Sequence, residues 1–158
     1  GGTKNDGIFS IKQTADGYIM AGYSTSNDGD ASLNHGGADG WVIKTDNWGI
    51  ILWQKSIGGT KEDVFDAVTV TTDGGYILAG RSFSNDGDLV QNYGLTDGWL
   101  VKLNSGGTIQ WQQTYGGSNA EYIMDVVETD NHDFVFGGLT KSSNGNLSLN
   151  YGNNEQDK

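Results

Sequence analysis

Two stretches of the sequence place oxygen-bearing side chains close together and in the same order. In each stretch two aspartates flank a glycine, an asparagine follows, and a third aspartate precedes a Gly-Trp pair. The residues are Asp28, Asp30, Asn34 and Asp39 in the first stretch, and Asp86, Asp88, Asn92 and Asp97 in the second. Calcium binds six to eight oxygens from carboxylates, amides and backbone carbonyls. The pattern therefore predicts one calcium ion per stretch, with carbonyl oxygens completing the coordination shell.

The same residues have a second interpretation that involves no metal. Asn, Asp and Gly tolerate a left-handed backbone, and Asn and Asp side chains bond to nearby amides, so Asn-Asp-Gly-Asp is also typical of a solvated turn. The spacing differs from that of the EF-hand calcium loop. The formal net charge of −11 favours cation binding without deciding between the two interpretations.

Three tryptophans are candidates for contact with a ligand: Trp41, Trp99 and Trp48. Trp41 and Trp99 each follow an Asp-Gly pair, and an aromatic ring beside a hydrogen-bond acceptor suits a glycan. Trp41 and Trp99 occupy equivalent positions in the first two repeats, which favours a structural role for them, in packing between sheets. Trp48 has Gly106 as its counterpart, so we expect it to be exposed on a contact surface.

The composition argues against several classes of function. The chain has no cysteine, and its two histidines, His35 and His132, do not stand at matching positions. No catalytic triad, thiol nucleophile or transition-metal cluster is therefore indicated, and we expect no enzymatic activity. The acidic charge argues against nucleic acid as a partner. No apolar run approaches the roughly 20 residues that insertion into a membrane requires.

These residues all lie within a repeat of 57 to 58 residues. The repeats begin with Gly-Gly-Thr or Gly-Gly-Ser at residues 1, 58 and 116, which divides the chain into residues 1–57, 58–115 and 116–158. Short apolar segments bounded by Gly, Asp or Asn predict β-strands and turns. The predicted strands are 8–14, 18–23, 41–45 and 50–57 in the first repeat, 65–71, 76–81, 99–103 and 108–115 in the second, and 123–129 and 134–139 in the third.

Four antiparallel strands joined by turns form a meander that cannot bury both of its apolar faces alone. Stacking such sheets around an axis gives a β-propeller, so the sequence predicts an all-β chain of about 2.5 propeller blades. The third, partial blade has two strands and the following loop, because residues 153–158 stand where the second repeat has Asp97 and its strand. A closed propeller needs at least about four blades. We therefore expect other copies of the chain, or missing blades of a longer chain, to complete it.

The repeat resembles those of large secreted bacterial β-propeller proteins. The strings that carry the resemblance are Gly-Gly-Thr-x-x-Asp, Asp-Gly-Gly-Tyr-Ile-Leu-Ala-Gly, Ser-Asn-Asp-Gly-Asp, Asp-Gly-Trp-Leu-Val-Lys-Leu and Ile-Gln-Trp-Gln-Gln-Thr-Tyr-Gly-Gly, within residues 1–151. The strand order is also similar to that of YVTN-type four-stranded blades, in which the first strand is innermost. The resemblance implies an extracellular or cell-surface location and a role in adhesion, scaffolding or recognition.

Together these features predict a non-enzymatic structural or adhesion module that acts through blade-to-blade or subunit association and is stabilised by calcium. The alternative is a carbohydrate-binding propeller with one site per blade, for which a glycan or a surface protein would be the partner.

Overall fold

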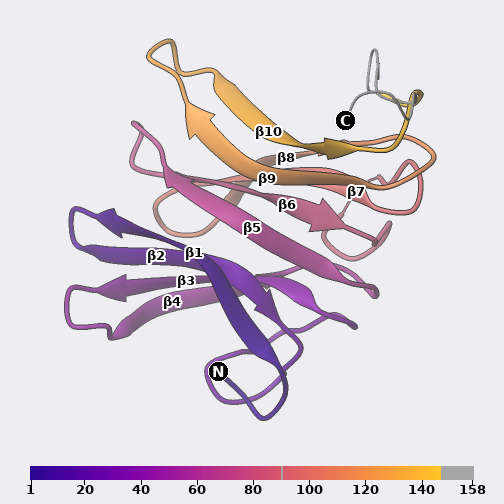
Figure 1. Cartoon of the computed structure of the whole chain (residues 1–158). Coiled ribbons are helices and arrows are strands. Elements are labelled where there is room, and N and C mark those ends of the chain that lie inside the picture. The colour runs from indigo at the N-terminus through magenta and orange to yellow at the C-terminus, as the bar shows by residue number, and fades with distance from the viewer. Residues whose placement is uncertain (90, 147–158) are drawn as a thin grey trace, which may run out of the picture.

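The computed structural model describes residues 1–89 and 91–146, and these residues form ten β-strands and no helix (Figure 1). The all-β prediction is confirmed. Residues 147–158 of the predicted third blade lie outside the described residues. The strands are β1 (Asp6–Thr14), β2 (Gly17–Ser24), β3 (Asp39–Asp46), β4 (Ile51–Ile57), β5 (Asp63–Val70), β6 (Tyr76–Ser82), β7 (Asp97–Leu103), β8 (Ile109–Tyr115), β9 (Glu121–Glu128) and β10 (Phe134–Thr140).

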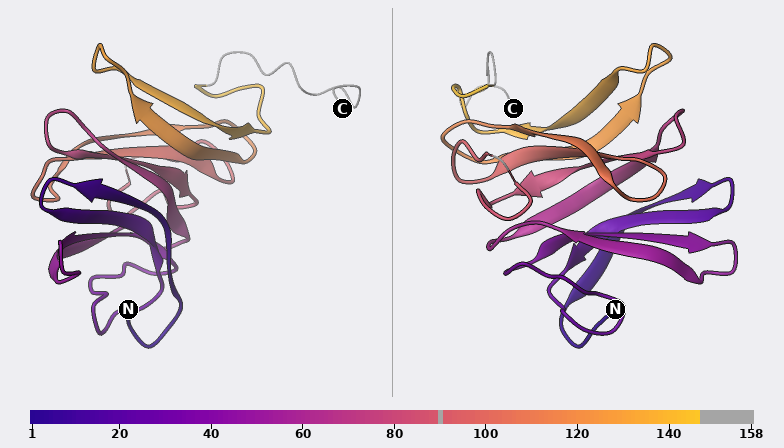
Figure 2. Two further views of the ribbon diagram at one scale, coloured as in Figure 1. Left: turned by 60° about the vertical axis from the view of Figure 1, so that its left-hand side comes forward. Right: turned by 180° about the vertical axis from the view of Figure 1, so that it is seen from behind.

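The strands pair in chain order into three antiparallel sheets. The first sheet is β1-β2-β3-β4, the second is β5-β6-β7-β8, and the third is the β9-β10 pair. The sheets stack face to face in the same order, with β5 against β1, β2 and β3, and β9 against β5, β6 and β7 (Figures 1 and 2). The described residues form an open stack, in which no ring closes.

Apolar side chains from facing sheets fill the first junction. Ile19, Ala21 and Val42 of the first sheet meet Phe65, Val68 and Trp99 of the second sheet. Within the second sheet, the ring of Phe65 stacks on that of Trp99 with 4.7 Å between ring centroids. All of these side chains are fully buried. Burying an aliphatic or aromatic side chain of this size contributes about 1.5–3 kcal/mol, so the face-to-face contact is a main source of stability.

The second junction uses the opposite face of the second sheet. Ala67, Ile77 and Leu100 pack there against Ile123 and Val126 of β9. Neighbouring sheets therefore cover both faces of the second sheet, and all residues of β7 and all but one of β6 are buried.

A β-bulge recurs where the first strand of each sheet meets the second. The register shifts at Phe9, at Asp66 and, in the third sheet, opposite the Gly137–Gly138 step. Beside each bulge the second strand has a glycine, and a Cβ on it would overlap a carbonyl oxygen of the first strand. These glycines are Gly22, Gly80 and Gly138. The close approach of the two strands therefore requires glycine at this position.

The third sheet offers a matched test of this requirement. A Cβ on Gly138 would overlap the carbonyl oxygen of Tyr122, whereas a Cβ on the adjacent Gly137 would meet no atom within 4 Å. We expect Gly138→Ala to lower the free energy of unfolding by about 1–3 kcal/mol through overpacking. Gly137→Ala is the control and should leave it unchanged or slightly raised. Equal thermal unfolding midpoints for the two variants would contradict the close-approach explanation.

Candidate functional site at the sheet junctions

The Gly-Gly-Thr segment that starts each repeat is held by the long loop of the same repeat. In the second repeat, Asp86 Oδ1 accepts the amide hydrogen of Thr60 at 2.9 Å, and Asp86 Oδ2 accepts the Thr60 hydroxyl at 2.8 Å. Asp88 accepts the amide of Gly58 at 3.2 Å. The same arrangement occurs in the first repeat, where Asp28 accepts hydrogen bonds from Thr3 and Asp30 accepts one from the Gly1 nitrogen. In the third repeat, Asn144 accepts the Ser118 amide and Asn146 accepts the Gly116 amide.

These hydrogen bonds stabilise the charged form of the loop carboxylates. The Thr3 amide and hydroxyl lower the pKa of Asp28, and the Thr60 amide and hydroxyl lower the pKa of Asp86. In the third repeat asparagine makes the same amide contacts without a charge. Binding the Gly-Gly-Thr segment therefore explains the Asp-Gly-Asp spacing without a metal ion.

The loop asparagines fasten the loop to itself. Asn34 Nδ2 donates to the carbonyl oxygens of Ser24 and Gly37, each at 3.0 Å, and Asn34 Oδ1 accepts the Gly36 amide at 3.1 Å. Asn92 donates to Ser82 in the same way at 3.1 Å. These amide groups therefore fix the path of the chain between the second and third strands.

The third aspartate of each predicted calcium set lies apart from this arrangement, at the junction with the next sheet. Asp39 and Asp97 are the first residues of β3 and β7, and both are completely buried. Asp39 Oδ2 accepts the amide of His35 at 3.0 Å and contacts its Nδ1 at 2.6 Å, and Asp97 Oδ2 accepts the amide of Tyr93 at 2.7 Å. The second carboxylate oxygen of each, Oδ1, has no hydrogen-bond partner among the described residues.

A second buried acid faces each of these aspartates from the next repeat. Asp63 at the start of β5 accepts hydrogen bonds from Ser82 at 2.5 Å, from Ser84 at 2.7 Å and from the Gly59 amide at 2.8 Å. Asp39 Oδ1 and Asp63 Oδ2 both lie 2.9 Å from the position that a Cβ on Gly58 would occupy. Only a glycine therefore fits between the two carboxylates.

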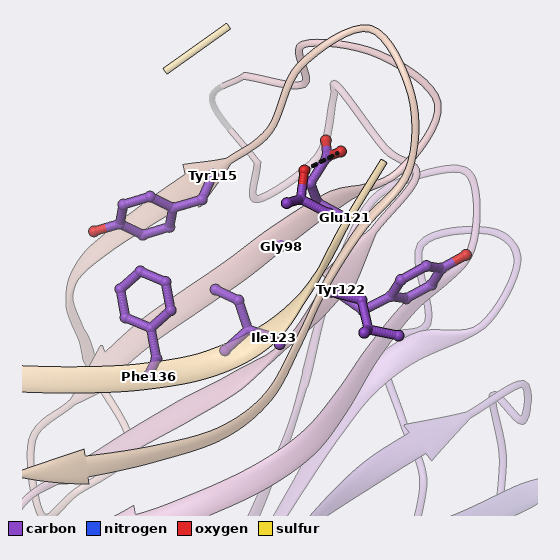
Figure 3. Close-up of a pocket in the computed structure, with 9 residues that line it drawn as sticks. Gly98, Tyr115, Glu121, Tyr122, Ile123 and Phe136 are labelled. Atoms are coloured by element: carbon purple, nitrogen blue, oxygen red, sulfur yellow. Dashed lines mark hydrogen bonds between the residues drawn. The ribbon is translucent and has the colours of Figure 1, made fainter. Parts of the chain in front are cut away.

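The second junction has Glu121 in the place of Asp63. Its carboxylate accepts the Gly117 amide at 2.8 Å, the Thr140 hydroxyl at 3.1 Å and the Lys141 amide at 3.2 Å. Figure 3 shows Glu121 at the edge of a small cavity of about 160 Å³, with the rings of Tyr115 and Phe136 on its other side. Across this junction a Cβ on Gly116 would overlap Asp97.

The paired acids are electrostatically unfavourable in their fully charged state. Burial raises the pKa of Asp39, and the nearby Asp63 adds to the effect despite the contact with His35. Burial likewise raises the pKa of Asp97, and Glu121 adds to it. Like charges removed from water favour retention of a proton by one member of a pair.

Backbone hydrogen bonds fasten the loop of one repeat to the start of the next. The amide of Asp63 donates to the carbonyl of Ala38 at 2.6 Å, and the amide of Glu121 donates to that of Thr96 at 2.7 Å. Thr96 also forms an isolated parallel bridge with Ala120. We call this set of contacts the junction motif. It comprises a loop carbonyl, the aspartate that follows this carbonyl and begins the third strand, and the glycine and the acid of the next repeat. At the first junction these are Ala38, Asp39, Gly58 and Asp63, and at the second they are Thr96, Asp97, Gly116 and Glu121.

The three candidate tryptophans differ in exposure. Trp41 and Trp99 are buried, and each donates its indole N–H to a glutamine of the neighbouring strand, Gln54 or Gln112, at 3.0 Å. Their ring faces are covered by protein, which argues against stacking on a ligand. Trp48 is 85% exposed in the β3–β4 turn, as the sequence predicted.

Sequence reasoning missed the acid that completes each junction. Asp6, Asp63 and Glu121 recur at the same distance after the Gly-Gly start, so the signal was present in the Gly-Gly-Thr-x-x-Asp string. The residues 1–89 and 91–146 contain no group of three or more His, Asp or Glu side chains placed to bind a metal ion. The calcium site stays one of the two interpretations of the sequence, beside that of a solvated turn.

No protein-family model matches the sequence, and no curated protein matches it. In the part of the chain that the structure describes, no helix has the length and apolar character needed to cross a bilayer.

Calcium binding is tested by thermal unfolding in EDTA and in calcium chloride. Because protein donors already bond to the Asp28 and Asp86 oxygens, we expect the same midpoint in both conditions. A midpoint several degrees higher in calcium, and lost in Asp86→Asn, would contradict this expectation and support the calcium prediction.

The buried acids predict an unusual pH dependence. A raised pKa means that the charged form of Asp39 costs stability above the folded-state pKa, and that this cost disappears as the pH falls toward the ordinary value of 3.8. Asp39→Asn should therefore be more stable than the wild type at about pH 8, with a gain that shrinks toward about pH 4. Thermal unfolding across this range measures the gain.

The control for this experiment is Asp28→Asn, because hydrogen bonds lower rather than raise the pKa of Asp28. It should lose stability at about pH 8. A destabilised Asp39→Asn at that pH would contradict an unfavourable charge at the junction.

Proposed function

We propose that this chain is a non-enzymatic structural module of the cell exterior, built from β-propeller blades, that works by stacking on further copies of itself. The resemblance to secreted bacterial propeller repeats supports the location and the blade geometry. The two internal junctions support the mode of association. At each of them one repeat packs on the next through an apolar cluster and an equivalent backbone hydrogen bond.

The observation that carries the proposal is a difference in exposure between equivalent residues. Phe65 and Val68 of β5 are fully buried against the first sheet. Their counterparts in β1, Ile8 and Ile11, are 39% and 56% exposed. The first sheet thus has the same kind of receiving face as the second, with no sheet covering it among the described residues.

The opposite end of the stack has the complementary surface. Ile77 of the second sheet is fully buried beneath the third sheet, whereas its counterpart Val135 is 56% exposed. Val127 of the same sheet is also half exposed. Contacts between one such end and the other are head to tail, and they generate a ring when the rotation closes and a filament when it does not.

The polar groups at the junctions support a structural rather than a catalytic role. The acids that recur in each repeat accept hydrogen bonds from a backbone amide of the repeat start and from a serine hydroxyl at the end of the second strand, as Asp6 and Asp63 show. Acids that recur at every junction and accept hydrogen bonds from the chain itself stabilise the arrangement of the sheets.

Replacing exposed residues of the receiving face tests the proposal. We expect the wild type to associate as its concentration rises, starting from a monomer of 16.9 kDa, and Ile8→Ser with Ile11→Ser to weaken this association at least about tenfold. Sedimentation velocity at several concentrations measures it.

Trp48→Ser removes more exposed apolar surface, but from a turn away from this face, and serves as the control. The proposal fails if the wild type stays monomeric at millimolar concentration, or if Trp48→Ser weakens association as much as the change on β1.

A further inference from the structure

We propose that a cleft between the first and second sheets binds a neutral sugar, which packs on Trp53 and hydrogen-bonds to Asp16 and Lys44. The cleft has a volume of about 360 Å³, and small-molecule sites usually measure roughly 300–1,000 Å³. It lies where β3 and β5 end, whereas the junction motif lies where these strands begin (Figure 1). Binding here is separate from the proposed self-association.

The ammonium group of Lys44 has a hydrogen that no acceptor of the described chain takes. Lys44 is 3% exposed, and its Nζ lies 2.8 Å from both Asp16 Oδ1 and the Thr45 carbonyl oxygen. An ammonium group carries three hydrogens. The third has no acceptor within residues 1–89 and 91–146, and Lys44 lines the cleft. A buried donor without a partner costs stability, which an oxygen of a ligand would restore.

The equivalent lysine of the second sheet has acceptors for all three hydrogens. Lys102 Nζ donates to Asp73 at 2.9 Å, and to the Leu103 carbonyl oxygen and Gln110 Oε1 at 3.1 Å each. The first repeat has Leu52 at the position of Gln110, and the Leu52 side chain offers no acceptor. The unbonded hydrogen is therefore specific to the first repeat and is not a consequence of the fold.

Two further polar groups line the same cleft. The Asp16 side chain is 71% exposed, and Lys44 and Thr14 lower its pKa, so it stays charged. Tyr76 is only 3% exposed, and its hydroxyl has no hydrogen-bond partner among the described residues. Burial and the charge of Asp16 raise the pKa of Tyr76, so the hydroxyl keeps its proton. A ligand thus meets one acceptor and two donors.

The ring beside these groups indicates the class of ligand. Trp53 is half-buried in the cleft, with its ring centroid 6.0 Å from that of Tyr76. The C–H side of a pyranose is apolar and packs well on an indole. Two neighbouring sugar hydroxyls can donate to Asp16 and accept from Lys44. A charged ligand is disfavoured, because Asp16 repels an anion and Lys44 repels a cation.

Titration with simple sugars tests the site. The probes are methyl α-glucoside, methyl α-mannoside, methyl β-galactoside and N-acetylglucosamine, and isothermal titration calorimetry measures their binding. We expect at least one of them to bind with a dissociation constant of about 1 mM or lower, the affinity that a ligand of this size ordinarily reaches.

Two variants copy residues that other repeats already carry, so they should leave the fold intact. Leu52→Gln copies Gln110 and gives Lys44 its third acceptor. It should weaken sugar binding about tenfold or more, because the sugar loses a hydrogen bond from a charged group. Tyr76→Phe copies Phe134 and removes the hydroxyl, so it should weaken binding several-fold.

Matched controls make the same changes outside the cleft. Leu95→Gln alters an exposed loop residue, and Tyr18→Phe alters the equivalent tyrosine of the first repeat. Both should bind sugar as the wild type does. The inference is overturned if none of the four sugars binds at about 10 mM. It is also overturned if Leu52→Gln and Tyr76→Phe bind as tightly as the controls.

Discussion

Consecutive repeats meet where two buried carboxylates converge on a glycine that has no side chain to separate them. Asp39 and Asp63 do this around Gly58. At the second junction Asp97 lies against Gly116, and Glu121 is near enough to raise the pKa of Asp97. The position of the glycine fixes how closely the loop of one repeat approaches the start of the next. The backbone hydrogen bonds across the junction are consistent with that spacing.

Much of the fold follows from local sequence signals. Alternating apolar runs between Gly, Asp and Asn located all ten strands to within about two residues, because hydrophobic period and turn residues act over short distances. The partner of Asp39 could not be found in this way. The sequence suggested that Asp39 joins Asp28 and Asp30 of its own loop, whereas the structure places it beside Asp63, which comes from the next repeat. Contacts between repeats depend on how the sheets stack, and a repeat pattern alone does not specify that.

The repeats keep the positions of the junction residues and vary the chemistry around them. The third repeat holds its Gly-Gly-Ser start with Asn144 and Asn146, where the other repeats use aspartates. An amide oxygen accepts the same backbone hydrogen bond as a carboxylate, so the geometry persists while the charge changes. The geometry of these contacts is therefore common to the repeats, and the net charge of a loop is free to differ between them.

Among the described residues, neighbouring sheets pack on both faces of the second sheet and on one face each of the first and third. In a linear array of units that contact only their neighbours, the central unit gains two interface energies and each terminal unit gains one. Amide hydrogen exchange is then slowest in β6 and β7 and becomes faster toward β1 and β10. Folding of such an array nucleates most readily around the central sheet and propagates outward, so each added repeat converts a fraying end into protected interior.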